Sequence, residues 1–253
     1  MDFDISHLLD QWEYQPGQVV VRRFKAKDGT VKIQLRVDLG LLQMNAEGRP
    51  DGKRPFGYTS LLEHYQARLY KHVAAHGGSD EGFTLKAEDC AKLQLEALQY
   101  HHRYICMLQL EDYPAVVRDA ERNLALFAFV AKHSASEDLA WALRQFQPQL
   151  LMVLTRARGS QALQADDYAL AIHHVEEGLE KIRAFYVDNS RADAVEHSGE
   201  ILSLENWLEE IRAKRPLSPR EKLEKALDEA VTREDYEKAA KVRDALRNLK
   251  TAE

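Results

Sequence analysis

The stretch Ser218–Lys250, SPREKLEKALDEAVTREDYEKAAKVRDALRNLK, contains the signals of two short helices and of the turn between them. Ser218 can cap the first free amides, Pro219 suits the first helical position, and Glu221 completes a capping box. Apolar residues then recur at helical spacing on either side of the turn. They are Leu223, Leu227 and Val231 before it, and Tyr236, Ala239, Val242, Leu246 and Leu249 after it, with Ala240 beside them.

Two helices of this length bury little area by themselves, and isolated helices of about a dozen residues are marginal in water. The small side chains of Ala239 and Ala240 would let a neighbouring helix approach closely. The segment is therefore expected to dock onto something.

This segment resembles the UvrB/UvrC motif, or UVR domain, a helical hairpin found in bacterial excision-repair subunits and in some protease-adaptor and chaperone-regulating proteins. The resemblance rests on Leu223, Leu227, Ala230-Val231, Glu234-Asp235-Tyr236-Glu237, Ala239-Ala240, Val242-Arg243-Asp244, Leu246 and Leu249. It implies protein contact, either with a partner or with a second copy. The residues expected to carry that contact are Tyr236, Glu237, Ala240, Arg243 and Asp244.

The remaining machinery of excision repair has no counterpart in the sequence. There is no G-x-x-x-x-G-K-[ST] phosphate loop, helicase pattern or nuclease cluster. The Cys-x-x-Cys zinc pairs of kinase activators that share the motif are missing as well. We therefore expect a non-enzymatic scaffold or adaptor of bacterial type. Two alternatives are a DNA-repair accessory that binds excision-repair subunits or DNA, and a regulator of a chaperone-protease or kinase in stress response.

Composition and targeting signals indicate a soluble helical protein. The chain has 253 residues, of which 30% are charged, and a mean hydropathy of −0.49. The acidic start and the lack of a following apolar run argue against a secretory signal. With only Cys90 and Cys106, reduced thiols are expected rather than a disulfide framework. The predicted location is the cytoplasm, without a membrane span.

Charge is unevenly distributed along the chain. Residues 17–57 carry nine Lys/Arg against four Asp/Glu, a local charge of +5, whereas the whole chain has a net charge of −6. The segment from Pro216 onward is neutral, so direct contact of the UVR-like hairpin with nucleic acid is not expected. If nucleic acid were contacted, the basic N-terminal segment would do it.

The same basic segment contains the strand signals of the chain. The runs Gln18–Lys25 and Val31–Leu42 flank an Asp28-Gly29 turn, which predicts a β-hairpin. Two strands are rarely stable alone, so they must lean on helices, pair between chains or gain a further strand. The Gly- and Pro-rich segment Asn45–Tyr58 then predicts an ordered loop and a domain boundary.

One face of this predicted hairpin is polar. Gln34, Arg36 and Asp38 alternate with apolar residues and project together, so they could recognise a peptide, a carboxylate or a polar metabolite. The favoured interpretation is a solvated strand face with a weak surface pair between Arg36 and Asp38.

From Ser60 onward the pattern predicts a mainly helical body. The expected helices span 60–76, 86–110, 113–133, 137–165, 167–187, 198–214, 219–232 and 235–249, and Pro148 either splits the fourth or marks its start. Acidic-Tyr turns at Tyr113 and Tyr168, echoed at Tyr236, resemble the middle of a tetratricopeptide-type helical hairpin. Because their spacing departs from that repeat, we expect a degenerate array or bundle. The predicted domains are 1–58, 59–214 and 216–250.

The histidines do not form a metal-binding pattern. His-x-x-Glu spacings occur around His173-His174 and His197, but the zincin motif and the paired motifs of a di-metal bundle are absent. No catalytic residue, metal or cofactor is therefore expected, and the aromatic residues spread at helical spacing are assigned to the core.

Overall fold

The computed structural model describes residues 4–250, except for the side chains of 219 and 248–250. Contacts divide the chain into two compact units, one that ends at Leu208 and one that begins at Glu209. The boundary expected at residue 58 and the three-domain division stay predictions.

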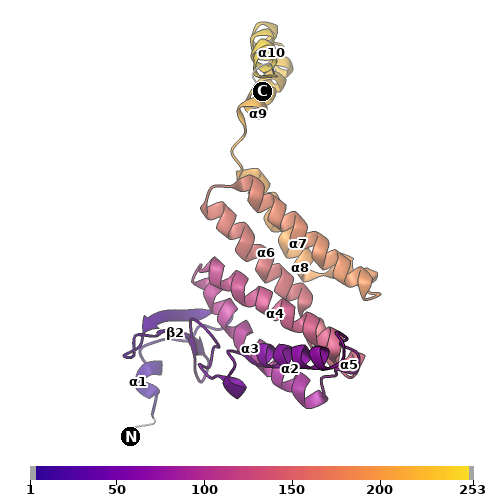
Figure 1. The fold of residues 1–253 in the computed structure, drawn as a ribbon. Helices are drawn as coiled ribbons and strands as arrows, with labels where there is room; N and C mark the ends of the chain where they lie inside the picture. The colour runs from indigo at the N-terminus through magenta and orange to yellow at the C-terminus, as the bar shows by residue number, and fades with distance from the viewer. Residues whose placement is uncertain (1–3, 251–253) are drawn as a thin grey trace. The chain divides into compact units, whose positions relative to one another are not determined.

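The elements follow in the order helix, sheet, helices (Figure 1). Their bounds are α1 Ser6–Leu9, β1 Val20–Lys25, β2 Val31–Val37, β3 Gly40–Asn45, η1 Pro55–Gly57, α2 Leu61–Ala75, α3 Ala87–Gln109, α4 Tyr113–His133, α5 Glu137–Arg144, α6 Gln147–Gln164, α7 Tyr168–Asp188, η2 Ala192–His197, α8 Gly199–Lys214, α9 Pro219–Thr232 and α10 Tyr236–Lys250. The protein is mainly helical with a small N-terminal antiparallel sheet and a C-terminal helix pair. No helix in the described residues has both the length and the apolar character needed to cross a membrane.

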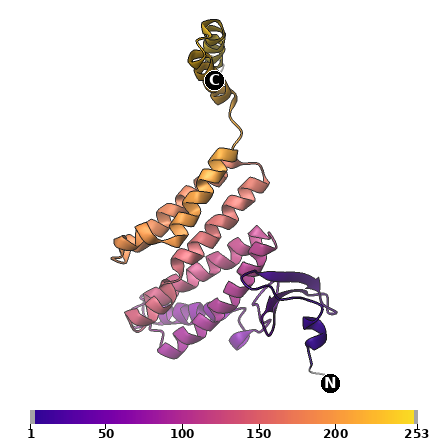
Figure 2. The same ribbon diagram turned by 180° about the vertical axis from the view of Figure 1, so that it is seen from behind.

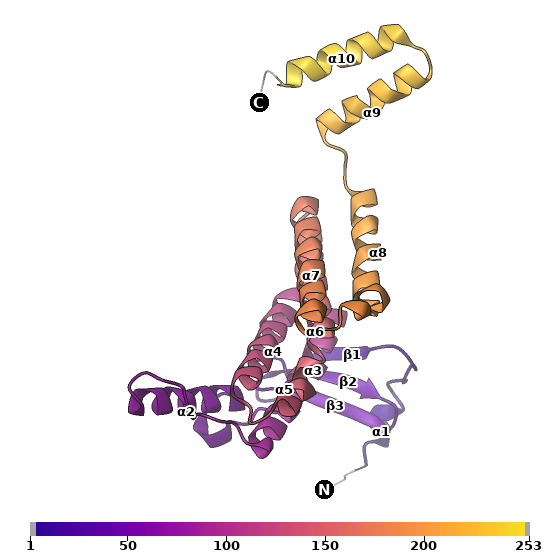
Figure 3. The same ribbon diagram turned by 90° about the vertical axis from the view of Figure 1, so that its right-hand side faces the viewer.

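The sheet has three strands in the order β1-β2-β3, so the predicted hairpin is incomplete. The run from Val31 to Leu42 contains two strands, because a tight turn at Asp38-Leu39 pairs Val37 with Gly40. β2 lies between the other two strands (Figure 3). Its residue Ile33 is fully buried and belongs to the core cluster shared with the helices. The third strand gives the pair the support that two strands alone lack.

The long predicted helix 137–165 is two helices, α5 and α6. The break falls at Gln145-Phe146, and Pro148 lies in the first turn of α6, where its missing amide hydrogen costs nothing. The sequence left open whether Pro148 splits a long helix or marks the start of one. In the structure it lies at the start of the second of two helices. The short helix α1 was not predicted.

The core of the first unit runs from the sheet through α3 and α4 to α6 (Figures 1 and 2). Val116, Leu126 and Val130 on α4 are completely buried in this core. Beyond them α6 and α7 approach so closely that a Cβ atom on Gly178 would lie 2.0 Å from Thr155 Oγ1. Only glycine fits at this crossing.

Three helix pairs are joined by the same turn: α3–α4, α6–α7 and α9–α10. The residue before the N-cap of the second helix has a left-handed backbone each time, with φ of 56° at Glu111, 56° at Asp166 and 57° at Glu234. Non-glycine residues rarely adopt this conformation, so its threefold use identifies a shared turn.

The aspartates that follow complete the turn. The amide N–H groups of Asp112, Asp167 and Asp235 donate to the carbonyl five residues earlier at 3.0, 2.9 and 2.8 Å. Their side chains accept the amide three residues later at 3.3, 2.9 and 3.0 Å. One residue therefore closes the first helix and caps the second.

Candidate functional site

α9 and α10 form the C-terminal helical hairpin (Figure 3). It begins at a complete capping box. The Glu221 amide N–H donates to Ser218 Oγ at 3.1 Å, and the Ser218 amide N–H donates to Glu221 Oε2 at 2.8 Å. The Arg215 guanidinium also pairs with Glu221. Arg215 first, and then the bonds with Ser218, lower the pKa of the Glu221 carboxyl to about 2.

The inner face of the hairpin differs from the predicted apolar stripes. Ala230 and Ala239 are buried, whereas Val231 is 53% and Tyr236 70% exposed, so neither belongs to the packed stripe as predicted. The turn brings the two alanines together, and their small side chains allow the helices to meet there. The other predicted inner residues, Leu223, Leu227, Val242 and Leu246, are half-buried, and the side chain of Leu249 lies outside the described residues.

The predicted partner-binding residues lie on the outer part of α10. Tyr236, Ala240 and Arg243 follow one another at i, i+4 and i+7, which places them on one stripe of the helix. Ala240 is half-buried at its edge, and Glu237 and Asp244 are exposed beside it. The structure thus brings all five onto one side of the helix.

These charged residues differ in their availability. Glu237 accepts a bond from Lys241 Nζ at 2.8 Å, within the same helix. Arg243 and Asp244 make no ion pair or hydrogen bond with their side chains among the described residues. The Arg243 guanidinium and the Asp244 carboxylate are therefore available to pair with charged groups of a partner.

The three shared turns allow a direct comparison of their tyrosines. Tyr113 and Tyr168 are half-buried, and Tyr113 packs against the core of the first unit. Tyr236 occupies the same position of the same turn and is 70% exposed. The C-terminal hairpin thus lacks the covering that its two counterparts have.

The second predicted site, the polar face of the sheet, is not solvated as expected. Gln34 and Arg36 are 7% and 8% exposed, because the chain around Trp12 covers this face. Gln34 accepts from Arg22 Nε at 2.7 Å and donates to Gln43 Oε1 at 2.8 Å.

The predicted Arg36–Asp38 surface pair is also wrong. The Arg36 guanidinium donates to backbone carbonyls, among them Trp12 O at 2.8 Å and Asp38 O at 2.9 Å, and does not reach the Asp38 carboxylate. Asp38 lies exposed in the turn between β2 and β3. Gln34 and Arg36 share a face, and Asp38 is separated from them.

A buried network of charged residues fixes the loop that follows the sheet, and the sequence interpretation missed it. Arg103 and Asp119, each 1% exposed, form a bidentate pair at 2.6 and 2.8 Å. Arg103 Nη1 also donates to Asn45 O at 3.0 Å and Gly48 O at 2.7 Å. The pair therefore anchors the loop to α3 and α4.

Glu96 is the second centre of this network and is completely buried. Its carboxylate accepts the amides of Leu61 at 2.7 Å and Leu62 at 3.2 Å, and pairs with Arg49 at 2.9 Å and with Arg122. The Glu96 carboxylate therefore both caps the start of α2 and binds Arg49 of the loop that follows the sheet. The available signal was the position of Glu96 between Leu93 and Ala97, inside an apolar stripe.

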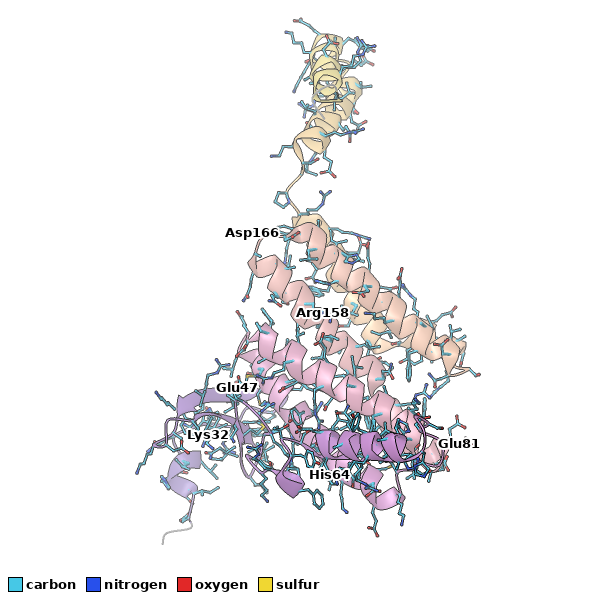
Figure 4. All side chains as sticks on the ribbon, in the orientation of Figure 1. Lys32, Glu47, His64, Glu81, Arg158 and Asp166 are labelled. Atoms are coloured by element: carbon cyan, nitrogen blue, oxygen red, sulfur yellow. The ribbon has the colours of Figure 1, made fainter. Side chains whose placement is uncertain are left out.

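A groove of about 540 Å³ opens between α4, α6 and α7. Leu124, Leu151 and Phe185 line it, and Arg158 pairs across its rim with Glu121 at 2.5 Å (Arg158 is labelled in Figure 4). Its lining contains charged residues of both signs, so the groove shows no preference for one kind of charged ligand.

Two histidines and both cysteines lie in packed surroundings. His101 Nδ1 lies 2.7 Å from Tyr104 Oη, and burial lowers the pKa of His101 and His174. Cys90 and Cys106 are buried free thiols, and burial raises the pKa of Cys106 to about 12. In the part of the chain that the structure describes, no three potential ligand side chains gather as a metal site.

Comparison with known protein families gives one match. Residues 219–252 match the UvrB/uvrC motif, an interaction module of excision-repair proteins. The match spans α9 and α10 with the face that contains Tyr236, and it begins one residue after the N-cap Ser218. Comparisons of the chain with curated proteins and with solved structures give no match. The C-terminal hairpin is a UVR domain.

Proposed function

We propose that this chain is a non-enzymatic docking protein whose UVR domain binds a partner protein, or a second copy of itself, through the outer face of α10. Tyr236 supplies the apolar part of the contact, and Arg243 and Asp244 supply its charge selectivity. The exposed position of Tyr236, in a turn whose two counterparts have half-buried tyrosines, carries this proposal.

The energetics of the hairpin support binding through this face. A tyrosine is a frequent anchor of protein interfaces because it buries a large area and has few rotatable bonds. The neighbouring Ala240 has a small side chain, so a partner helix can approach next to the ring. Free charges of both signs, on Arg243 and Asp244, favour a partner with the complementary arrangement and repel others.

The helical body has the role of a scaffold in this proposal. The repeated turn in α3–α4 and α6–α7, together with the sequence resemblance, supports a degenerate tetratricopeptide-like body. In the sequence, such a body lies between the N-terminal sheet and the UVR domain. The proposed setting is the bacterial cytoplasm, where Cys90 and Cys106 would remain thiols.

The proposal is tested with the full chain and its Arg243→Glu variant. Sedimentation velocity measures self-association, and affinity capture from a lysate followed by mass spectrometry measures partner binding. We expect Arg243→Glu to weaken the specific association by about tenfold, because it replaces an attraction with a repulsion.

Lys225→Glu is the matched control, since Lys225 is exposed on α9 and its side chain has no bond among the described residues. It makes the same change of charge outside the proposed face. If both variants behave like the wild type in both measurements, α10 does not bind through Arg243 and the assignment of this face is wrong.

A further inference from the structure

The outer edge of β1 is free of backbone pairing in the described residues. The Ala26 amide donates to Thr30 O at 2.8 Å at the end of the hairpin, and bonded pairs alternate from there along an antiparallel ladder. Arg22 and Phe24 therefore bond to β2, while Val21, Arg23 and Lys25 direct their N–H and C=O groups outward. A further strand could pair with these groups.

The strands are cationic and contain no acidic residue. β1, β2 and β3 contain five Lys/Arg and no Asp/Glu, within a chain of net charge −6. The cations are Arg22, Arg23, Lys25, Lys32 and Arg36. Of these, only Arg23 pairs with a carboxylate, that of Asp112, among the described residues.

The face that contains Arg22 and Arg36 is positive in a largely desolvated setting. Among the described residues, the Arg36 guanidinium is bound only by carbonyl oxygens, and it lies 5.9 Å from the centre of the Tyr14 ring, while Arg22 lies 4.2 Å from the centre of the Trp12 ring. Carbonyl oxygens and rings orient these cations but do not neutralise them, and a buried unpaired charge is costly. An anionic group beside Arg22 would lower that cost. Lys32 lies on the same face of the sheet and is labelled in Figure 4.

Cations on an edge strand also oppose uncontrolled pairing, because a second copy of β1 would bring like charges together. A strand that carries carboxylates escapes this repulsion and gains ion pairs. The edge is therefore selective for acidic segments.

We propose that the free edge of β1 docks an extended acidic segment of a partner protein. The segment would pair its backbone with Val21 and Arg23 and place carboxylates against Arg22 and Lys25. This docking site is separate from the UVR domain, and it would let the chain hold two partners at once.

The test uses the full chain and a fluorescein-labelled peptide of Glu-Glu-Thr-Thr repeats, which presents carboxylates on both faces of an extended strand, because Arg22 and Lys25 lie on opposite faces of β1. Fluorescence anisotropy measures its binding beside that of a Gln/Thr peptide and of labelled oligothymidylate. NMR-detected hydrogen exchange locates the binding. We expect the acidic peptide to bind and to protect the amides of Val21 and Arg23.

Arg22→Glu and Lys25→Glu are each expected to weaken binding of the acidic peptide by about tenfold. Lys25 is exposed at the end of β1, so its variant should fold even if Arg22→Glu does not. Lys71→Glu on α2 is the matched control and should bind like the wild type, because Lys71 is exposed and lies outside the sheet.

Four outcomes would overturn the proposal. The first is that the acidic peptide does not bind. The second is that the Gln/Thr peptide binds equally well, and the third is that oligothymidylate binds more tightly than either peptide. The last is binding that leaves the Val21 and Arg23 amides unprotected, which would exclude strand addition.

Discussion

Replacing Glu96 with glutamine should destabilise the first unit more than any exposed substitution. The carboxylate is completely buried and accepts four donors, from the Leu61 and Leu62 amides, Arg49 and Arg122. Glutamine keeps one acceptor oxygen but directs an NH₂ group at donors, and the two guanidinium groups lose their shared counter-charge.

The magnitude follows from this geometry. Removing one partner of a buried ion pair costs about 3–5 kcal/mol. The side chains of Arg49 and Arg122 are 11% and 16% exposed, so water can partly replace the lost carboxylate. We therefore expect Glu96→Gln to lower the free energy of unfolding by about 3 kcal/mol, at the lower end of that range.

Urea unfolding followed by tryptophan fluorescence measures this change. Trp12, Trp141 and Trp207 all precede Glu209, so the signal reports the first unit alone. The control is Glu180→Gln, a change on the exposed side of α7 that should stay within about 0.5 kcal/mol of the wild type.

A double variant tests the cause. If the loss arises from the ion pair, adding Arg122→Met to Glu96→Gln should cost less than the sum of the two single changes. A Glu96→Gln protein that unfolds within about 0.5 kcal/mol of the wild type would refute the reasoning, because an exposed carboxylate would behave in this way.

Three further predictions concern the helix pairs. Gly178→Ala should lower the free energy of unfolding by about 1–3 kcal/mol in the same urea assay, because the new Cβ overlaps Thr155. Adding Thr155→Ala removes the two closest atoms but keeps a Cβ at 2.8 Å, so it should restore part of the loss, and no recovery at all would show that the overlap is not the cause. Asp167→Ala should cost about 1 kcal/mol by removing the cap of α7, and an unchanged urea midpoint would contradict that role. Because the pKa of Glu221 is lowered in the folded hairpin, its contribution to stability is complete above pH 4.5 and is lost as the pH falls towards about 2. An NMR titration of its side-chain carbon should have its midpoint near that value, and a midpoint at the ordinary value of 4.5 would exclude the bond with Arg215.

Local signals predicted much of the secondary structure. The helix 113–133 was predicted with the bounds that α4 has, and 219–232 with those of α9, because Asp112 and Ser218 cap their helices through bonds to residues three positions away. The third strand was missed as a separate element, since Asp38-Leu39 lacks the Asn-Gly or Asp-Gly signature of a tight turn.

The candidate sites were predicted less completely. Periodicity was enough to place Tyr236, Ala240 and Arg243 on one side of α10, but it also placed Tyr236 among the packed residues. Alternation along β2 placed Gln34 and Arg36 on one face, but it could not show that the segment around Trp12 covers that face. Contacts between residues distant in sequence decide burial, and periodicity does not contain them.

The sequence by itself determined the helical class, the caps and the UVR hairpin, because each depends on interactions within a few residues along the chain. The tertiary structure alone decided that Glu96 and Arg103 are buried, that α6 and α7 meet at Gly178, and that the edge of β1 stays open. These features depend on where separate elements meet in space, because a charge is tolerated in a core only where donors and acceptors from several elements converge on it.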